Sequence, residues 1–174
     1  MKIYLLRHTR VDVPSGICYG QTDVSLAETF ENELAIIKNT LLYVTFEKVY
    51  SSPLRRCMRL AKEFSDEIIS DARLMELNFG DWENKSWEEI FDCEKGKRWF
   101  SNYLEEVCPN GESSQMLQNR VQNFIDELPK INGNILIVAH SGAIRMFRMI
   151  LEGWSTKRAF DTPIAYGQVS VINF

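Results

Sequence analysis

The chain has 174 residues, of which 45% are hydrophobic and 25% charged, close to the average for a folded globular protein. It carries 20 basic and 24 acidic residues, a net charge of −4. This balance argues against a general binder of nucleic acid or anionic membranes, because such binding depends on clustered lysine and arginine. The length fits one domain, which we expect to span residues 1–174.

Two further features bear on the cellular compartment. No apolar run approaches the roughly 18 residues needed to cross a bilayer, and the N-terminus lacks the long apolar stretch of a signal peptide. The cysteines form no CxxC pair, so neither a zinc knuckle nor a thioredoxin-type site is indicated. We therefore expect a cytoplasmic protein with reduced thiols at Cys18, Cys57, Cys93 and Cys108.

The first half of the chain alternates apolar runs with helical spacing. Residues 3–6 predict a buried strand, and apolar residues repeating on one helix face predict a helix over 26–41. A short strand is predicted over 48–51, closed by Pro53, and a second amphipathic helix over 54–68.

The second half begins with an aromatic, charged stretch that we interpret as a helical excursion beside the core, over about 82–130. Its last part, 117–128, has regular helical spacing. The unbroken apolar run 135–139 predicts a central parallel strand, followed by a helix over 142–152 and a last strand over 169–174. Alternating strands and helices predict an α/β fold, a three-layer sandwich with helices on both faces of a mostly parallel sheet.

The only two histidines both come just after predicted strands: His8 follows the first strand, and His140 follows the run 135–139. Ligands of open α/β sheets bind outside the carboxyl ends of the strands. Arg7 stands beside His8, and the strand over 48–51 leads into Arg55 and Arg56. Imidazoles and guanidiniums converging on one crevice predict an anion site, most simply for phosphate.

Several other phosphate chemistries lack their motifs. There is no P-loop, no pair of aspartates two residues apart, and no cysteine with arginine six positions on. Residues 16–20 fit a nucleophile elbow, but they follow no strand and lead into no helix. Two histidines are too few for a clustered metal site. Covalent catalysis by a histidine, with no metal and no cofactor, is what remains.

Five motifs in order carry a family resemblance. Together they resemble the histidine phosphatase superfamily, the phosphoglycerate-mutase-like proteins, over residues 3 to about 152. Each motif alone is weak, but five in order with sensible spacing are specific. The motifs are Leu6-Arg7-His8-Thr9, Ser51-Ser52-Pro53-Leu54-Arg55-Arg56, Leu74-Met75-Glu76-Leu77-Asn78-Phe79-Gly80-Asp81-Trp82-Glu83, Pro109-Asn110-Gly111-Glu112-Ser113 and Val138-Ala139-His140-Ser141-Gly142.

The run over 13–24 resembles the alpha-ribazole phosphatase branch, whose members remove phosphate from alpha-ribazole 5′-phosphate in cobalamin assembly. One departure is visible: many members have glycine after the first histidine, where this chain has Thr9. A β-branched residue tolerates fewer backbone conformations, so the loop there is expected to differ. The family pattern S-P-L-x-R selects Arg56 and leaves Arg55 as a flanking residue.

The resemblance implies a role for each site residue. His8 attacks phosphorus and forms a phosphohistidine, while Arg7, Arg56 and His140 bind the phosphoryl oxygens. Glu76 protonates the leaving group and then activates water.

The alcohol part of the substrate must be recognised outside this set. Tyr19, Gly20, Gln21 and Ser141 are the predicted substrate-binding residues. Trp82, Trp87 and Trp99 can offer a stacking surface, although we expect at least two of them to pack in the core. Arg145 and Arg148 are expected to face solvent.

The resulting hypothesis is a phosphomonoesterase, and three alternatives stay open. A broad-specificity or phosphoglycerate-type phosphatase or mutase shares the pattern, although 174 residues leave little material to shield a mutase intermediate. A protein-phosphohistidine phosphatase and a non-catalytic phosphate-binding module are the others. The expected partner is a small phosphomonoester, with no nucleic acid or membrane, and a homodimer is left open.

Overall fold

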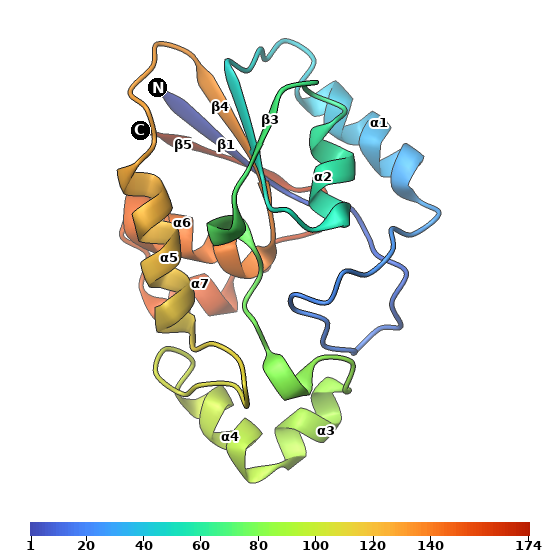
Figure 1. The fold of residues 1–174 in the computed structure, drawn as a ribbon, viewed down its shortest axis with the longest axis vertical. Coiled ribbons are helices and arrows are strands. Elements are labelled where there is room, and N and C mark those ends of the chain that lie inside the picture. The colour runs from blue at the N-terminus through green and yellow to red at the C-terminus, as the bar shows by residue number, and fades with distance from the viewer.

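A five-stranded sheet forms the centre of the computed structural model, which describes residues 1–174 (Figure 1). Its strand order is β3-β2-β4-β1-β5. All neighbours pair in parallel except β5, which runs antiparallel to β1 at one edge. The strands are β1 (Lys2–Arg7), β2 (Lys48–Ser51), β3 (Ile68–Ser70), β4 (Asn134–Ala139) and β5 (Val169–Asn173).

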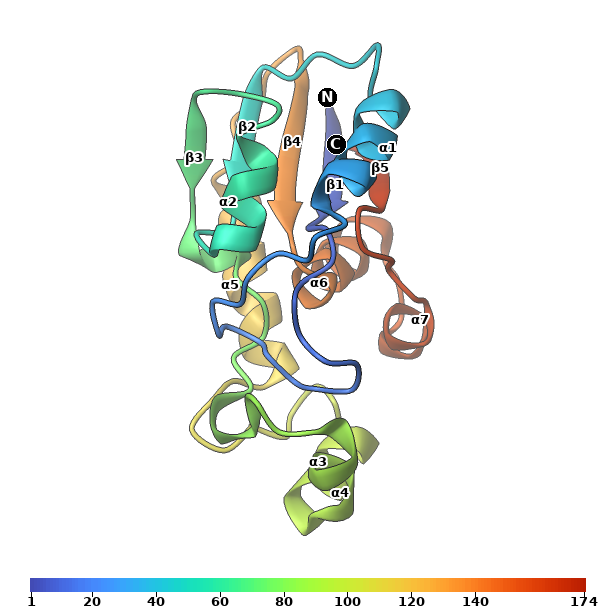
Figure 2. The ribbon, with the colours of Figure 1, turned by 90° about the vertical axis from the view of Figure 1, so that its right-hand side faces the viewer.

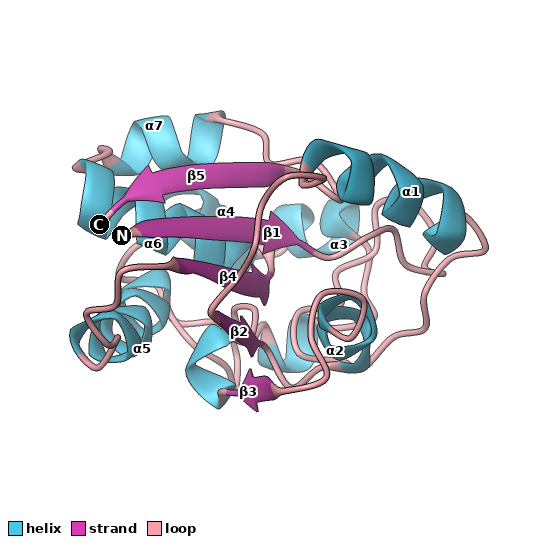
Figure 3. Cartoon of the chain, turned by 90° about the horizontal axis from the view of Figure 1, so that it is seen from above, coloured by secondary structure: helices cyan, strands magenta, loops and turns pink.

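Helices cover both faces of this sheet, as Figure 3 shows from above. Helices α1 and α2 lie on one side, and α5, α6 and α7 on the other. The helices are α1 (Phe30–Thr40), α2 (Arg55–Ala61), α3 (Trp87–Asp92), α4 (Glu94–Ser101), α5 (Ser114–Asp126), α6 (Ser141–Glu152) and α7 (Thr156–Asp161), with short 3₁₀ turns at Ala72–Leu74 and Gly80–Trp82. None combines the length and apolar character needed to cross a bilayer.

The layers follow from the alternation of side chains along β1. Ile3 and Leu5 join the larger apolar cluster, which includes α5 and α6, while Leu6 joins the smaller one with α1 and α2. Successive residues of a strand point to opposite faces, so an unbroken apolar run fills two cores at once. The predicted three-layer α/β sandwich is confirmed.

Helices α3 and α4 extend beyond the carboxyl ends of the parallel strands (Figure 2). A capping box begins α3: the Ser86 hydroxyl accepts the Glu89 N–H, and the Glu89 carboxylate accepts the Ser86 N–H. Aromatic rings join this segment to the rest, with Trp99 packed against Phe79 and Tyr103. The excursion therefore stands over the edge where strand-end residues gather.

Three elements differ from the sequence-based expectation. The second helix ends at Ala61, and Ile68 begins β3, because the segment between them turns and brings a new strand to the sheet edge. The first helix begins at Phe30, since Leu26 pairs in an isolated bridge with Val11. Helix α5, placed in the excursion, packs in the core with Val121 fully buried, so the excursion proper consists of α3 and α4.

Candidate active site

The two histidines meet where β1 and β4 end side by side. Arg7 is the register partner of Ala139, and the backbone N–H of His8 donates to the Ala139 carbonyl at 3.1 Å. The two imidazole centroids are 5.1 Å apart, and each histidine is only 1% exposed. Residues 132 positions apart are thus joined by the pairing of two central strands.

One hydrogen bond fixes the tautomer of His8. Its Nδ1 lies 2.7 Å from the carbonyl oxygen of Thr9. A carbonyl can only accept, so Nδ1 carries the proton in the neutral ring and Nε2 keeps the free electron pair. The ring is held in the tautomer that a nucleophilic Nε2 requires.

Two arginines flank this ring. Arg56 is fully buried and donates to the carbonyls of Thr22 and Gly20 at 2.8 and 2.6 Å. Arg7 donates to the Ile164 carbonyl at 2.5 Å. Neither arginine forms an ion pair with a carboxylate, so both keep a positive charge that no protein anion neutralises.

Unsatisfied donors gather at the same place. Five buried side-chain polar atoms have no hydrogen-bond partner in the protein, and three of them belong to Arg7, Thr9 and Arg56, the residues around His8. Buried polar groups normally find partners, and leaving one without costs about 1–3 kcal/mol. Two of these atoms are the Nε atoms of Arg7 and Arg56, whose charges have no carboxylate partner, so their clustering indicates a site built for an oxyanion.

Burial and charge keep both imidazoles neutral. Burial lowers the pKa of His8 well below 6.5, and the positive charges of Arg56 and Arg7 lower it further. Burial likewise lowers the pKa of His140. The Nε2 of His140 lies 2.9 Å from the Ser52 hydroxyl, which fixes that ring from the end of β2.

The Glu76 side chain, which comes from the segment between the two 3₁₀ turns, reaches the N-terminus of α6. Its carboxylate accepts the Gly142 N–H at 3.1 Å, the Ser141 hydroxyl at 3.3 Å and the Leu77 N–H at 2.9 Å. A Cβ on Gly142 would lie 2.1 Å from the Glu76 carboxylate, so only glycine permits this approach. Glu76 lines the same pocket as Arg7, which places a carboxyl group beside the anion site.

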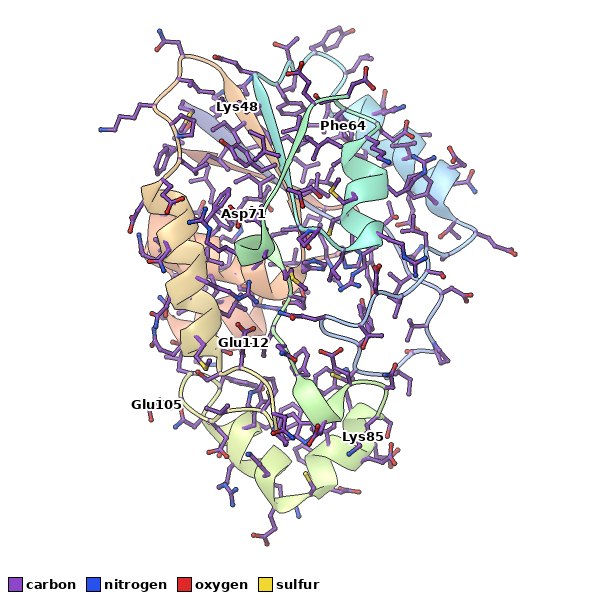
Figure 4. The ribbon with its side chains drawn as sticks, in the orientation of Figure 1. Lys48, Phe64, Asp71, Lys85, Glu105 and Glu112 are labelled. Atoms are coloured by element: carbon purple, nitrogen blue, oxygen red, sulfur yellow. The ribbon has the colours of Figure 1, made fainter.

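A polar frame that the sequence did not reveal holds the Glu76 backbone. Arg120 on α5 and the Gln21 side chain both donate to its carbonyl, at 2.8 and 2.9 Å. Arg120 also pairs with Glu112 at 2.9 Å, and Glu112 lies beside the lower end of α5 in Figure 4. Glu83 accepts the backbone N–H groups of Gln21 and Thr22. These contacts join residues in irregular loops that are far apart in the sequence, so the spacing of residue types along the chain does not predict them.

Two tyrosines lie over the cations. The Tyr19 and Tyr166 hydroxyls are 2.8 Å apart. The Tyr166 ring centroid lies 3.8 Å from Cζ of Arg7 and 5.6 Å from the His8 ring, and the Tyr19 centroid lies 5.3 Å from Cζ of Arg56. Stacking on a ring face stabilises a guanidinium, so both arginines are held in place by aromatic rings. Sequence reasoning found Tyr19 but missed Tyr166, which stands in an irregular segment.

A pocket of about 700 Å³ opens beside this set, and 15 of its 26 lining residues are hydrophobic. Tyr19, Gly20 and Ser141 are among them, as predicted substrate-binding residues; Gln21 is not, because its side chain holds Glu76. Aromatic side chains from the excursion and α7 form the far wall: Trp87, Trp99, Phe100, Tyr103 and Phe160. Trp82 is buried in the core and is absent from the lining.

Two arginines of α6 depart from the expectation of solvent exposure. Arg145 lines the pocket. Arg148 pairs with Glu152 at 2.8 Å with its side chain only 16% exposed. The expectation was wrong because α6 packs against α7, where Arg145 donates to the Ala159 carbonyl, and because Arg148 stacks on the Trp154 ring. Arg55, by contrast, pairs with Asp23 at the surface, while Arg56 turns inward.

Nowhere in the structure do three or more histidine, cysteine, aspartate or glutamate side chains gather as a metal-holding group.

The model of the histidine phosphatase superfamily, branch 1, matches residues 3–174. The chain belongs to this superfamily. It is accordingly a phosphoric monoester hydrolase. The family that the five motifs resemble and the predicted α/β fold are both confirmed. In this histidine phosphatase, the matched region includes all the strand ends described above.

Curated relatives fall into more than one activity. The chain is 28% identical to phosphoserine phosphatase 1 of Hydrogenobacter thermophilus, over 99% of this chain and 86% of the relative. It is 27% identical to the adenosylcobalamin/alpha-ribazole phosphatase of Escherichia coli K12, over 99% of this chain and 90% of the relative. The crystal structure of the alpha-ribazole phosphatase from Shigella flexneri superposes with a TM-score of 0.89 at 26% identity, covering 99% of this chain and 90% of that one.

Proposed function

We propose that this histidine phosphatase hydrolyses phosphomonoesters through a phosphohistidine on His8, and that its substrate is alpha-ribazole 5′-phosphate. The observation that carries the chemistry is the cluster of unsatisfied buried donors on Arg7, Thr9 and Arg56 around a neutral His8. A phosphate dianion supplies acceptors for these donors and charge for both guanidiniums.

In the first step, Nε2 of His8 attacks phosphorus and the bond from phosphorus to the ester oxygen breaks. Arg7, Arg56 and His140 stabilise the charge on the equatorial oxygens. Glu76, as the carboxylic acid, gives its proton to the leaving oxygen. The products of this step are the free alcohol, a Glu76 carboxylate and the phosphohistidine.

In the second step, water attacks the phosphohistidine and the bond from phosphorus to nitrogen breaks. The Glu76 carboxylate takes a proton from this water, which restores the acid form and releases inorganic phosphate. The same residue thus serves as acid and then as base, at one position beside the site.

The proposed substrate rests on the aromatic far wall. The pocket of about 700 Å³ exceeds what a small phosphorylated amino acid needs, and its wall of Trp87, Trp99, Tyr103 and Phe160 suits a flat heteroaromatic base. The Escherichia coli and Shigella flexneri relatives named as alpha-ribazole phosphatases support the same substrate.

The test measures phosphate release in metal-chelated buffer from alpha-ribazole 5′-phosphate, 3-phosphoglycerate, phosphoserine and p-nitrophenyl phosphate. A strong preference for the first is expected. His8→Asn should abolish release and the acid-labile phosphoenzyme together, whereas Asn119→Ala, a change on the outer side of α5, should retain both.

Other results overturn parts of the proposal. Phosphate release that survives in His8→Asn removes the phosphohistidine mechanism. Equal rates on all four esters remove the assigned substrate and favour a broad-specificity phosphatase. Transfer of phosphate between glycerate positions favours a mutase, and turnover of phosphohistidine in a protein alone favours the protein phosphatase. If no phosphate ester binds, the protein is neither the proposed phosphatase nor a phosphate-binding module. Binding without turnover favours the non-catalytic module.

A further inference from the structure

The arginines of this protein divide by their partners. Seven pair with carboxylates: Arg10, Arg55, Arg59, Arg73, Arg98, Arg120 and Arg148. Four have no carboxylate partner. Of these, Arg7 and Arg56 form the proposed phosphate site, and Arg158 stacks on Trp154 at the surface. The fourth, Arg145, lines the pocket without a role in the mechanism above.

The Arg145 side chain is anchored at one atom only. Its Nε donates to the Ala159 carbonyl on α7 at 2.8 Å, and its Cζ lies 5.7 Å from the Phe160 ring centroid. The two terminal nitrogens have no hydrogen-bond partner in the protein. With Nε occupied, the end of the guanidinium keeps two parallel N–H groups, the geometry that grips a pair of neighbouring oxygens.

Helix geometry fixes where this group stands relative to the reaction. Ser141, Gly142, Arg145 and Met146 line the pocket together, so one face of α6 forms its floor. Ser141 and Gly142 hold the Glu76 carboxylate. Arg145 is one turn further along, about 6 Å along the helix axis. It therefore lies farther along the pocket than the groups that hold Glu76, and the charges of Glu76 and Arg7 still act on it.

Arg145 forms no ion pair in the pocket, and the Glu76 charge favours its charged form only from a longer distance. Arg7 and Arg56 match the two charges of a phosphate dianion, and Glu76 holds its carboxylate toward α6. Arg10 is exposed and pairs with Glu33. Burial lowers the pKa of Arg145, so holding its charge here costs free energy that a bound acceptor recovers.

We propose that Arg145 is the specificity-determining residue for the alcohol part of the substrate, donating two parallel hydrogen bonds to a pair of neighbouring oxygens. A carboxylate and the vicinal diol of a sugar share this chemistry. The inference rests on the proposed phosphatase function of this pocket, and it assigns a residue to the substrate beyond the phosphate.

The test combines Arg145→Met with three esters in steady-state kinetics. Alpha-ribazole 5′-phosphate carries a vicinal diol, 3-phosphoglycerate a carboxylate, and phenyl phosphate, which replaces the nitrophenyl ester here, has no pair of neighbouring oxygens outside its phosphate. We expect kcat/KM to fall about 10- to 100-fold for the ester whose diol or carboxylate Arg145 contacts. A fall confined to the first identifies a diol, and one confined to the second a carboxylate. The value for phenyl phosphate should change less than about threefold, and Arg145→Lys should recover only part of the loss.

Arg148→Met is the matched control, since Arg148 stands on the same helix but pairs with Glu152; it should leave all three rates near those of the wild type. Equal losses on all three esters in Arg145→Met, or no loss on any, overturn the specificity role. A thermal unfolding midpoint close to that of the wild type shows that the variant is folded.

Equilibrium binding separates this proposal from the proposed function. Calorimetric titration of His8→Asn with each ester, with and without Arg145→Met, needs no turnover. A weaker Kd for the diol or carboxylate ester on loss of Arg145 supports the specificity role even where phosphate release fails. Unchanged Kd values overturn that role even where the wild type hydrolyses every ester.

Discussion

The two ends of the candidate site, the buried group around His8 and the pocket beside it, are built differently. At the phosphate end, which we define as Arg7, His8, Arg56 and His140, the side chains follow adjacent parallel strands and are held by backbone carbonyls and neighbouring rings. At the alcohol end, defined as Trp87, Trp99, Tyr103, Arg145 and Phe160, most side chains come from the short helices α3, α4 and α7 or from the turn after α4, and only Arg145 comes from the longer helix α6.

This difference separates the reaction from its selectivity. A sheet core fixes strand ends firmly, because shifting one strand would disturb two packed layers. The residues of short helices and loops at the surface can be substituted without such a cost, which suits the part of a pocket that distinguishes substrates. The similar chains include relatives named for phosphoserine and for alpha-ribazole, two different substrates.

The largest of these effects should follow loss of Glu76, the proposed proton donor between the two ends. We expect Glu76→Gln to lower kcat by about 10²–10⁴-fold on alkyl phosphates. The loss should be much smaller on p-nitrophenyl phosphate, because nitrophenolate leaves without a proton. The exposed Glu88→Gln serves as the control. Equal losses on both kinds of ester would place Glu76 outside the proton-transfer step.

Weakening the phosphate end should affect every substrate alike. Arg56→Lys removes the fork that spans the Thr22 and Gly20 carbonyls and the phosphoryl oxygens. We expect kcat/KM to fall about 10²–10³-fold across the whole ester panel. Arg55→Lys is the matched neighbour, paired with Asp23 at the surface, and should leave kinetics unchanged. A loss that depends on the alcohol would contradict the division between the ends.

A smaller effect should follow from moving Glu76 without removing it. In Gly142→Ala the new methyl group would lie 2.1 Å from the carboxylate, so Glu76 must shift. A displacement of about 1 Å can cost on the order of 10²-fold in rate. Steady-state kinetics should show a fall in kcat on alkyl esters with KM little changed. Ala143→Gly, next along α6, controls for changes in the helix, and an unaltered kcat in Gly142→Ala would exclude the close approach.

The sequence predicted the phosphate end better than the alcohol end. Apolar runs mark the strands, and the residue that ends a parallel strand has a known place at the sheet edge, so strand pattern alone was enough to bring His8 and His140 together. The places of Arg145 and Tyr166 could not be predicted in this way, because they depend on how α7 and its following loop fold back. Ile68 was assigned to a helix, since its spacing fits a helical face as well as a strand.

The last expected effect is on stability, and it concerns the phosphate end alone. Both histidines are there, and both have a pKa lowered below 6.5 by burial. Between these lowered pKa values and pH 6.5, the unfolded chain therefore binds protons that the folded protein does not bind. The contribution of the two histidines to the free energy of unfolding is full above pH 6.5 and falls as the pH drops toward their pKa values in the folded protein. The slope should reach up to about 1.4 kcal/mol per pH unit for each histidine.

Urea unfolding between pH 7.5 and 5 measures this slope, in a range above the titration of ordinary carboxyl groups. His140→Gln removes one of the two titrating rings and should roughly halve the slope, whatever it does to the stability itself. Trp87→Phe, at the alcohol end, should leave the slope as it is in the wild type. A slope unaffected by His140→Gln would mean that this ring is not buried in its neutral form. His140 would then no longer count among the groups that define the anion site.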